Sequence, residues 1–333
     1  MRSGIITAML SAMRLRAAAR LGRPTVLGMA ALAITIAVSA CGSNGGGPAA
    51  SAGAAGGSPG RITAVGAENQ YANVIAQIGG RYVSVTAIMN NPNTDPHSFE
   101  ASPSVATAVA AAKLIVQNGA GYDSFMNKIE SASPSRSRRV IDVQTLLGLP
   151  AFTRNPHLWY EPTTMPKVAA AIVRDLSALA PAHARYFDAN GRRFDATLQP
   201  WLHAIASFKR LHARTPVAVT EPVADYLLQA AGANVLTPWV LQADIMDGVD
   251  PAPQDVTLED NLFKQHRVKV FLYNRQVTNT VTESFLKLAT QNHIPVVGVY
   301  ETMPPGYSYG AWMLAETRAL SEAVTAHRST EGL

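Results

Sequence analysis

From Arg61 onward, short runs rich in β-branched residues alternate with longer stretches of helical periodicity. This alternation restricts the possible folds, because strands that take turns with helices are typical of parallel sheets covered by helices. The pattern occurs twice, once on each side of residues 165–212, which are almost entirely helical in pattern. We therefore expect an α/β protein of two lobes, each with a mostly parallel sheet flanked by helices, joined by a long connecting helix.

The expected elements fall into two similar sets. In the first set the strands are 62–65, 83–88, 114–117 and 140–143, and the helices are 68–78, 103–112 and 122–131. In the second set the strands are 217–220, 268–273 and 296–300, and the helices are 223–231, 258–266, 281–291 and 311–327. No short sequence repeat relates the two sets, so their similarity is one of architecture.

These patterns predict an N-terminal lobe at 61–180, a connecting helix at 181–212 and a C-terminal lobe at 213–333. Pro181 suits the first turn of a helix, whereas Pro200 is interior and is expected to kink or end one. A single large α/β domain with a helical insertion is the alternative organisation.

The first forty residues have the features of an export signal. They contain five arginines and no acid, and an apolar run at 25–38 that is shorter than the roughly twenty residues of a membrane-spanning helix. The run ends in Val-Ser-Ala-Cys, which resembles the lipobox of bacterial lipoproteins, and Cys41 is the only cysteine of the chain. We predict a signal peptide at 1–40 and lipidation of Cys41, which would anchor the protein on the extracytoplasmic face of the cell membrane. The alternative is a buried apolar helix with an incidental cysteine.

The segment that follows Cys41 is a predicted tether. Residues 42–60 contain eight glycines and no charged residue, a composition that forms a flexible coil rather than a core. Five of the 28 basic residues lie in the signal peptide, which leaves 23 basic and 23 acidic residues in the rest of the chain. The mature protein is therefore formally neutral, and nucleic acid is not expected as a partner.

One sequence motif matches a catalytic pattern. The run 306–310 fits G-x-S-x-G, with Ser308 as the nucleophile of a hydrolase. However, five residues separate the motif from its strand, and the only histidine downstream is His327, with Glu316 and Glu322 before it. A cell-surface serine or metal-dependent hydrolase is therefore the alternative function, and a glycine-flanked loop is the simpler interpretation. The single cysteine excludes thiolate metal clusters.

Two histidines and two glutamates are candidates for a metal site. His97 and His157 each follow a proline in an expected loop, whereas Glu221 and Glu301 each follow a strand directly. The carboxyl ends of strands form the edge where open α/β sheets bind ligands. Imidazole and carboxylate groups are ligands of divalent transition metals. The Pro-His pairs could equally be turn residues, and Glu221 could cap a helix.

At these residues the chain resembles the zinc and manganese solute-binding proteins of bacterial ABC importers. The resemblance is carried by Asp-Pro-His-Ser-Phe-Glu at 95–100, Leu-Ile-Val-Gln-Asn-Gly-Ala-Gly-Tyr at 114–122 and Asn-Pro-His-Leu-Trp at 155–159. It extends from about residue 62 to residue 326. In that family four ligands from two lobes enclose one metal ion, and a long helix joins the lobes with little hinge motion. The resemblance implies four ligands here, namely His97, His157, Glu221 and Glu301.

The implied cargo is one divalent transition metal ion, Zn²⁺ or Mn²⁺. The carboxylate donors, and the lack of a histidine-rich loop between His97 and His157, favour manganese, but zinc binds most such sites more tightly. At the third ligand position zinc members often have histidine and manganese members glutamate; at the fourth many members have aspartate. Groups expected to orient the imidazoles are Asp95, Glu100, Asn118 and Asn274. Asp247, Gly248 and Asp250 resemble part of a calcium loop and are interpreted as a turn.

The resemblance implies an extracytoplasmic solute-binding protein rather than an enzyme. Its partners would be a membrane permease with a cytoplasmic ATPase and, through the lipid anchor, the membrane itself, and it would act as a monomer. Metal affinity is expected to fall as His97 and His157 become protonated below about pH 6. A surface adhesin or structural lipoprotein without metal is a further alternative.

Overall fold

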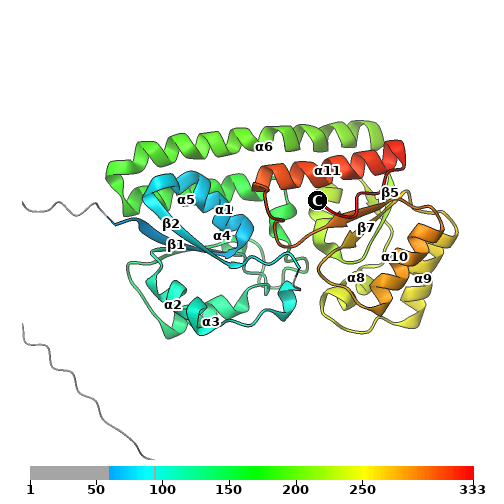
Figure 1. The fold of residues 1–333 in the computed structure, drawn as a ribbon, viewed down its shortest axis with the longest axis horizontal. Coiled ribbons are helices and arrows are strands. Elements are labelled where there is room, and N and C mark those ends of the chain that lie inside the picture. Colours follow the sequence, from blue (N-terminus) through cyan, green and yellow to red (C-terminus); the bar gives the residue numbers. More distant parts are fainter. Residues whose placement is uncertain (1–59, 94) are drawn as a thin grey trace, which may run out of the picture. The chain divides into compact units, whose positions relative to one another are not determined.

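Two four-stranded sheets organise the computed structural model, which describes residues 60–93 and 95–333 (Figure 1). The first sheet has the order β2-β1-β3-β4 and the second the order β6-β5-β7-β8. All six strand pairings are parallel. The two sheets therefore share one strand order, and the predicted fold class is confirmed.

The first sheet is covered by helices on both faces. Side chains of β1 and β3 alternate between two cores, so that Leu114 and Val116 belong to one core and Ile115 to the other. Such strands read as continuous apolar runs because both of their faces are buried. The elements are β1 (Ile62–Glu68), α1 (Asn69–Gly79), β2 (Val83–Met89), α2 (Pro103–Ala111), β3 (Leu114–Gln117), α3 (Ser124–Ala132), β4 (Arg139–Asp142) and α4 (Val143–Leu146), with 3₁₀ turns at Gly80–Tyr82, Pro96–Ser98 and Leu158–Tyr160.

The second sheet has the same plan. Its elements are β5 (Pro216–Val219), a 3₁₀ turn (Pro222–Ala224), α7 (Asp225–Ala230), β6 (Asn234–Val235), α8 (Trp239–Met246), α9 (Pro253–Lys264), β7 (Val270–Asn274), α10 (Thr280–Gln291), β8 (Val296–Val299) and α11 (Tyr309–Ala326). Sequence patterns missed β6, α8 and α4. β6 has two residues and α4 a single turn, and both are too short to show a period.

The connecting segment consists of α5 (Thr164–Leu179), a 3₁₀ turn (Pro181–His183) and α6 (Ala184–His212). α6 packs against α1, α5 and α11 (Figure 1). The expected end of the helix at Pro200 is wrong, because α6 continues through this residue. Pro200 cannot donate a hydrogen bond to Ala196, four residues earlier, but both residues are exposed, so water can bind the free carbonyl.

One apolar core contains residues from both sheets. It includes Val116 of β3 and Leu272 of β7, together with Phe187, Phe194 and Phe208 along α6. The predicted division into lobes at 61–180 and 213–333 stays a prediction. Within the described residues no helix is both long and apolar enough to cross a membrane. Residues 1–59, which include the predicted signal peptide and Cys41, lie outside the described residues.

Candidate metal centre

The four predicted ligands follow strands or loops at the carboxyl ends of the two sheets. His97 lies in the 3₁₀ turn after β2, and His157 directly precedes the 3₁₀ turn Leu158–Tyr160. Glu221 and Glu301 each come two residues after a strand of the second sheet, β5 and β8. The first sheet thus supplies two imidazoles and the second two carboxylates.

Three of these side chains meet at one point. The Nε2 atom of His97 lies 3.2 Å from Oε2 of Glu301, and the Nε2 atom of His157 lies 3.1 Å from the same oxygen. The candidate ligand atoms of the three residues lie within 4.8 Å of one another. His157 and Glu301 are fully buried, whereas a quarter of the His97 side chain is exposed. This cluster has the chemistry of a divalent metal site with one ligand accessible to solvent.

Glu221 is joined to this cluster through a single amide. The Nδ2 atom of Asn274 donates to Oε1 of Glu221 and to Oε1 of Glu301, at 2.7 Å in each case. The other carboxylate oxygen of Glu221, Oε2, is buried and has no hydrogen-bond partner in the described part of the chain. A buried carboxylate oxygen without a partner is costly unless a cation or proton occupies it. Glu221 therefore stands next to the cluster with one oxygen free.

The two histidine loops contain the same local hydrogen bond, from the backbone N–H of the histidine to an Asx side chain two residues earlier. The Oδ1 atom of Asp95 accepts from the backbone N–H of His97, and the Oδ1 atom of Asn155 accepts from that of His157. Asx side chains that bind the backbone two residues later stabilise such turns, and the intervening proline stiffens them. The motif D/N-P-H thus fixes the position of both histidines before any metal binds.

Asn155 also orients the imidazole of His157. Its Oδ1 atom lies 2.8 Å from Nδ1 of the ring, which places the ring proton on Nδ1 and leaves the lone pair of Nε2 free to bind a metal ion. Sequence reasoning did not single out Asn155, although its place two residues before His157 in an Asx-Pro motif was a usable signal.

The four residues expected to orient the imidazoles have other contacts. Asp95 holds the backbone of His97, and the Asn118 amide donates to the carbonyl of Pro156, next to His157. Asn274 binds the carboxylates, and Glu100 is exposed and makes no hydrogen bond or ion pair in the described residues. A further contact was not predicted: the hydroxyl of Tyr122 donates to Oε2 of Glu301 at 2.9 Å.

The protonation states follow from burial and from Glu301. Burial lowers the pKa of His157. Burial also lowers the pKa of His97, but the hydrogen bond and charge of Glu301 outweigh it and raise the value to about 9. Burial alone would raise the pKa of Glu301, but its hydrogen bonds to the two histidines hold this pKa far below the usual range. Burial and the charge of Glu301 raise the pKa of Glu221 well above its ordinary value. The metal-free site therefore holds protons that a cation would displace.

The residues of the hydrolase alternative do not meet. Ser308 directly precedes α11 and His327 directly follows it, so about 27 Å of helix separates them at 1.5 Å per residue. Glu316 accepts hydrogen bonds from Tyr160 and Trp312, and Glu322 pairs with Arg328. The expected order of catalytic groups is thus present in sequence but forms no triad.

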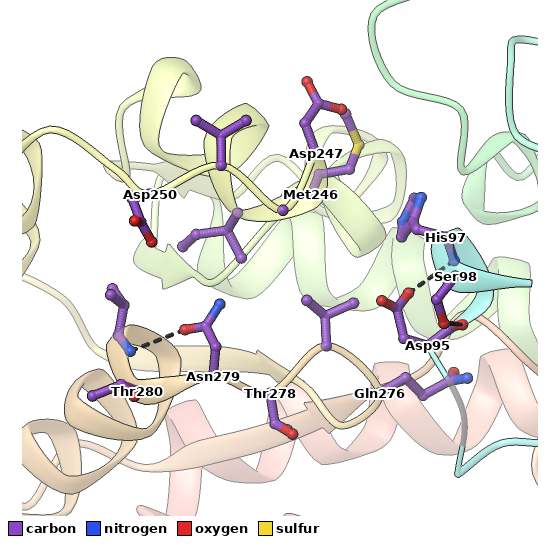
Figure 2. A pocket seen from close by; sticks show the side chains of 15 residues that line it. Asp95, His97, Ser98, Met246, Asp247, Asp250, Gln276, Thr278, Asn279 and Thr280 are labelled. Carbon is purple, nitrogen blue, oxygen red and sulfur yellow. Dashed lines mark hydrogen bonds between the residues drawn. The ribbon is translucent and has the colours of Figure 1, made fainter. Parts of the chain in front are cut away.

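A cavity of about 720 Å³ lies beside His97. Figure 2 shows Asp95, His97 and Ser98 on one side of it and the loops after α8 and β7 on the others. Asp247, Gly248 and Asp250 belong to the first of these loops, where Gly248 has a φ of +66°, so the predicted turn is present. Because His97 is the residue of the cluster on the cavity wall, the cavity lies on the solvent-exposed side of the cluster.

Comparison with known families agrees with this geometry. Residues 65–323 match the family model described as zinc-uptake complex component A, periplasmic. This chain belongs to that family. Members of the ZnuA family are therefore the reference for its fold, and the resemblance recognised in the sequence is confirmed.

Individual relatives are distant. A Thermotoga maritima protein named for metal binding is 31% identical over 94 residues, which cover 28% of this chain and 33% of that protein. The manganese-binding lipoprotein MntA of Halalkalibacterium halodurans is 26% identical over 178 residues, 51% of this chain and 58% of that one. The matched segments thus span between a third and about six tenths of these curated relatives.

A solved structure covers more of the chain. The periplasmic zinc-binding protein TroA of Treponema pallidum is 17% identical, with a TM-score of 0.67 over 81% of this chain and all of TroA. At this identity the similarity shows a common fold.

Proposed function

We propose that this protein is the extracytoplasmic solute-binding component of an ABC importer. It binds one Zn²⁺ or Mn²⁺ ion between its two lobes and delivers the ion to a membrane permease that works with a cytoplasmic ATPase. No bond is made or broken in this function, and the protein acts as a monomer. The proposal extends to the whole chain what its family membership indicates for residues 65–323.

The convergence of His97, His157 and Glu301 carries this proposal. These residues are far apart in the sequence, their donor atoms lie within 4.8 Å of one another, and two of the three residues, His157 and Glu301, are buried. Two imidazoles with two carboxylates, the second from Glu221, would supply a charge of −2 to a divalent cation. The names of relatives agree, since MntA is described as manganese-binding and TroA as zinc-binding.

The test is metal content and metal-dependent melting of residues 42–333, with His97→Ala and Glu301→Ala beside the wild type. A ligand that binds only the folded state raises the melting temperature, and a thousandfold excess over Kd adds about 4 kcal/mol. We expect one equivalent of Zn²⁺ or Mn²⁺ with a large shift that both substitutions abolish. The absence of a shift with either ion in the wild type contradicts the function.

We further propose that lipid on Cys41 anchors the protein outside the cytoplasm. The sequence at 38–41 and the uncharged tether support this arrangement. In cells that express the full chain, Cys41→Ser should move the protein from the membrane fraction to the soluble fraction. Retention of the variant in the membrane fraction argues against the anchor.

A further inference from the structure

The amide of Asn274 lies between the two carboxylates of the candidate site. Its Nδ2 atom has two hydrogens, and it donates one to Oε1 of Glu221 and one to Oε1 of Glu301, both at 2.7 Å. All three side chains are buried. The amide thus occupies one oxygen of each carboxylate.

The orientation of this amide is fixed by its other contacts. Asn274 ends strand β7, and its backbone N–H donates to the hydroxyl of Thr220 at 2.9 Å. Its Oδ1 atom accepts from the backbone N–H of Gln276 at 3.0 Å. Because a backbone N–H can only donate, Oδ1 must face Gln276, and Nδ2 must face the carboxylates. The two donors of Asn274 are therefore committed to Glu221 and Glu301.

This arrangement determines how many donors remain for a cation. Among the described residues, Oε2 of Glu221 has no hydrogen-bond partner. Oε2 of Glu301 faces both histidines and accepts one hydrogen bond from Tyr122, which leaves a second lone pair for the ion. Each imidazole contributes Nε2, since the Nδ1 atom of His157 is held by Asn155. Two nitrogens and two oxygens make four donors. Zinc sites in proteins are typically four-coordinate and tetrahedral, whereas manganese favours six-coordinate, oxygen-rich sites.

We propose that Asn274 is a specificity-determining residue, which keeps each carboxylate monodentate and thereby makes the site four-coordinate and selective for Zn²⁺ over Mn²⁺. This inference rests on the proposed function, because it concerns the same ion site. The carboxylate ligands alone would favour Mn²⁺, whereas the contacts of Asn274 make the site favour Zn²⁺. Without the amide, both carboxylates could bind through two oxygens, and up to six donors would be available.

The first experiment needs no substitution. The full chain, stripped of metal by a chelator, is loaded with one equivalent of Co²⁺, and its visible absorption is recorded. A tetrahedral Co²⁺ ion lacks a centre of symmetry and absorbs far more strongly than an octahedral one. We expect the intense bands of a four-coordinate ion. Weak octahedral bands from bound Co²⁺ would overturn the inference.

The second experiment compares ion affinities in variants. Asn274→Leu removes both donors at similar volume, and Asn274→Ser leaves at most one. The matched control is Asn190→Leu, which removes a buried amide in α6 that donates to the carbonyl of Ile78 and contacts none of the proposed ligands. Changes around metal ligands typically alter affinity 10- to 100-fold.

We expect the ratio of the Mn²⁺ Kd to the Zn²⁺ Kd to fall at least about tenfold in Asn274→Leu, by less in Asn274→Ser, and to stay unchanged in Asn190→Leu. Equal losses for both ions in the Asn274 variants would refute the inference. If neither variant folds, the Co²⁺ spectrum of the wild type decides. Failure of the wild type to bind any of the three ions would instead refute the proposed function, so the two failures are distinguishable.

Discussion

At the scale of single residues, the site is defined by the protons that a metal ion must displace. With the ordinary pKa of histidine, protons would compete with a metal ion for the imidazoles only at low pH. However, Glu301 raises the pKa of His97 to about 9, whereas burial keeps His157 neutral. In the proposed site, the proton on His97 is therefore the one that competes with metal at physiological pH.

This leads to a prediction about pH. Metal binds neutral His97, so the apparent affinity should rise about tenfold per pH unit as the pH approaches 9 and level off above it, with about one proton released by His97. Calorimetric titrations in buffers of different ionisation enthalpy measure this release. In His97→Gln the pH dependence between 7 and 9 should be weaker. An equally steep dependence in this variant would show that another group titrates.

The residues of the site differed in how visible they were in the sequence. His97 and His157 were found because a D/N-P-H motif is local, and Glu221 and Glu301 because they follow strands. Tyr122 was missed because its contact with Glu301 joins residues 179 positions apart and depends on how the sheets pack. Asn155 was missed although its contact with His157 is local. Asn274 was found, but its partners are carboxylates rather than imidazoles.

At the scale of secondary-structure elements, α11 contains a buried acid whose charge affects stability. Burial raises the pKa of Glu316 to about 8, although Tyr160 and Trp312 donate hydrogen bonds to it. In the unfolded chain this carboxyl titrates near 4.5. Between pH 4.5 and about pH 8, Glu316 is protonated in the folded protein and ionised in the unfolded chain. The contribution of Glu316 to the free energy of unfolding therefore falls as the pH rises from 4.5 to about 8.

The corresponding prediction concerns Glu316→Gln in the metal-free protein. Between pH 5 and pH 9 the variant should gain a few kcal/mol in unfolding free energy relative to the wild type, measured by urea denaturation. Glu322→Gln is the control, because this residue lies on the exposed side of the same helix and should change stability by less than about 1 kcal/mol at either pH. A difference between Glu316→Gln and wild type that is independent of pH contradicts the raised pKa.

The helix α6 supports a prediction about Pro200. An interior proline costs a helix about 3 kcal/mol, and here the exposed position moderates that cost without removing it. We expect Pro200→Ala to raise the free energy of unfolding by about 1–3 kcal/mol. Gln199→Ala, at the exposed neighbouring position, should change it by less than about 0.5 kcal/mol. A loss of stability in Pro200→Ala would mean that the proline has a packing role.

The elements themselves were largely predictable. Strands such as Leu114–Gln117 are short apolar runs bounded by turn residues, so the pattern located them directly. The continuation of α6 past Pro200 was not predictable, because the tertiary contacts of the helix outweigh a local break.

At the scale of the whole molecule, the apolar core shared by both sheets predicts cooperative unfolding. Since β3, α6 and β7 contribute to one core, residues 60–333 should unfold in a single transition whose calorimetric and van't Hoff enthalpies agree. Zn²⁺ should move this transition as a whole, because its proposed ligands come from both sheets. Two transitions, of which metal moves only one, would show that the lobes unfold independently.

The origin of the ligands has a mechanical consequence. The first sheet presents two imidazoles and the second two carboxylates, so each sheet carries half of the donors. In the proposed site, each half by itself would be a weak two-donor chelator, and tight binding would arise from the effective concentration at which the fold holds one half against the other. Affinity then depends steeply on the spacing between the halves. A force that draws the two halves apart would release the ion without any change in covalent bonding. The Kd for the metal would then depend on the distance between the imidazole half and the carboxylate half.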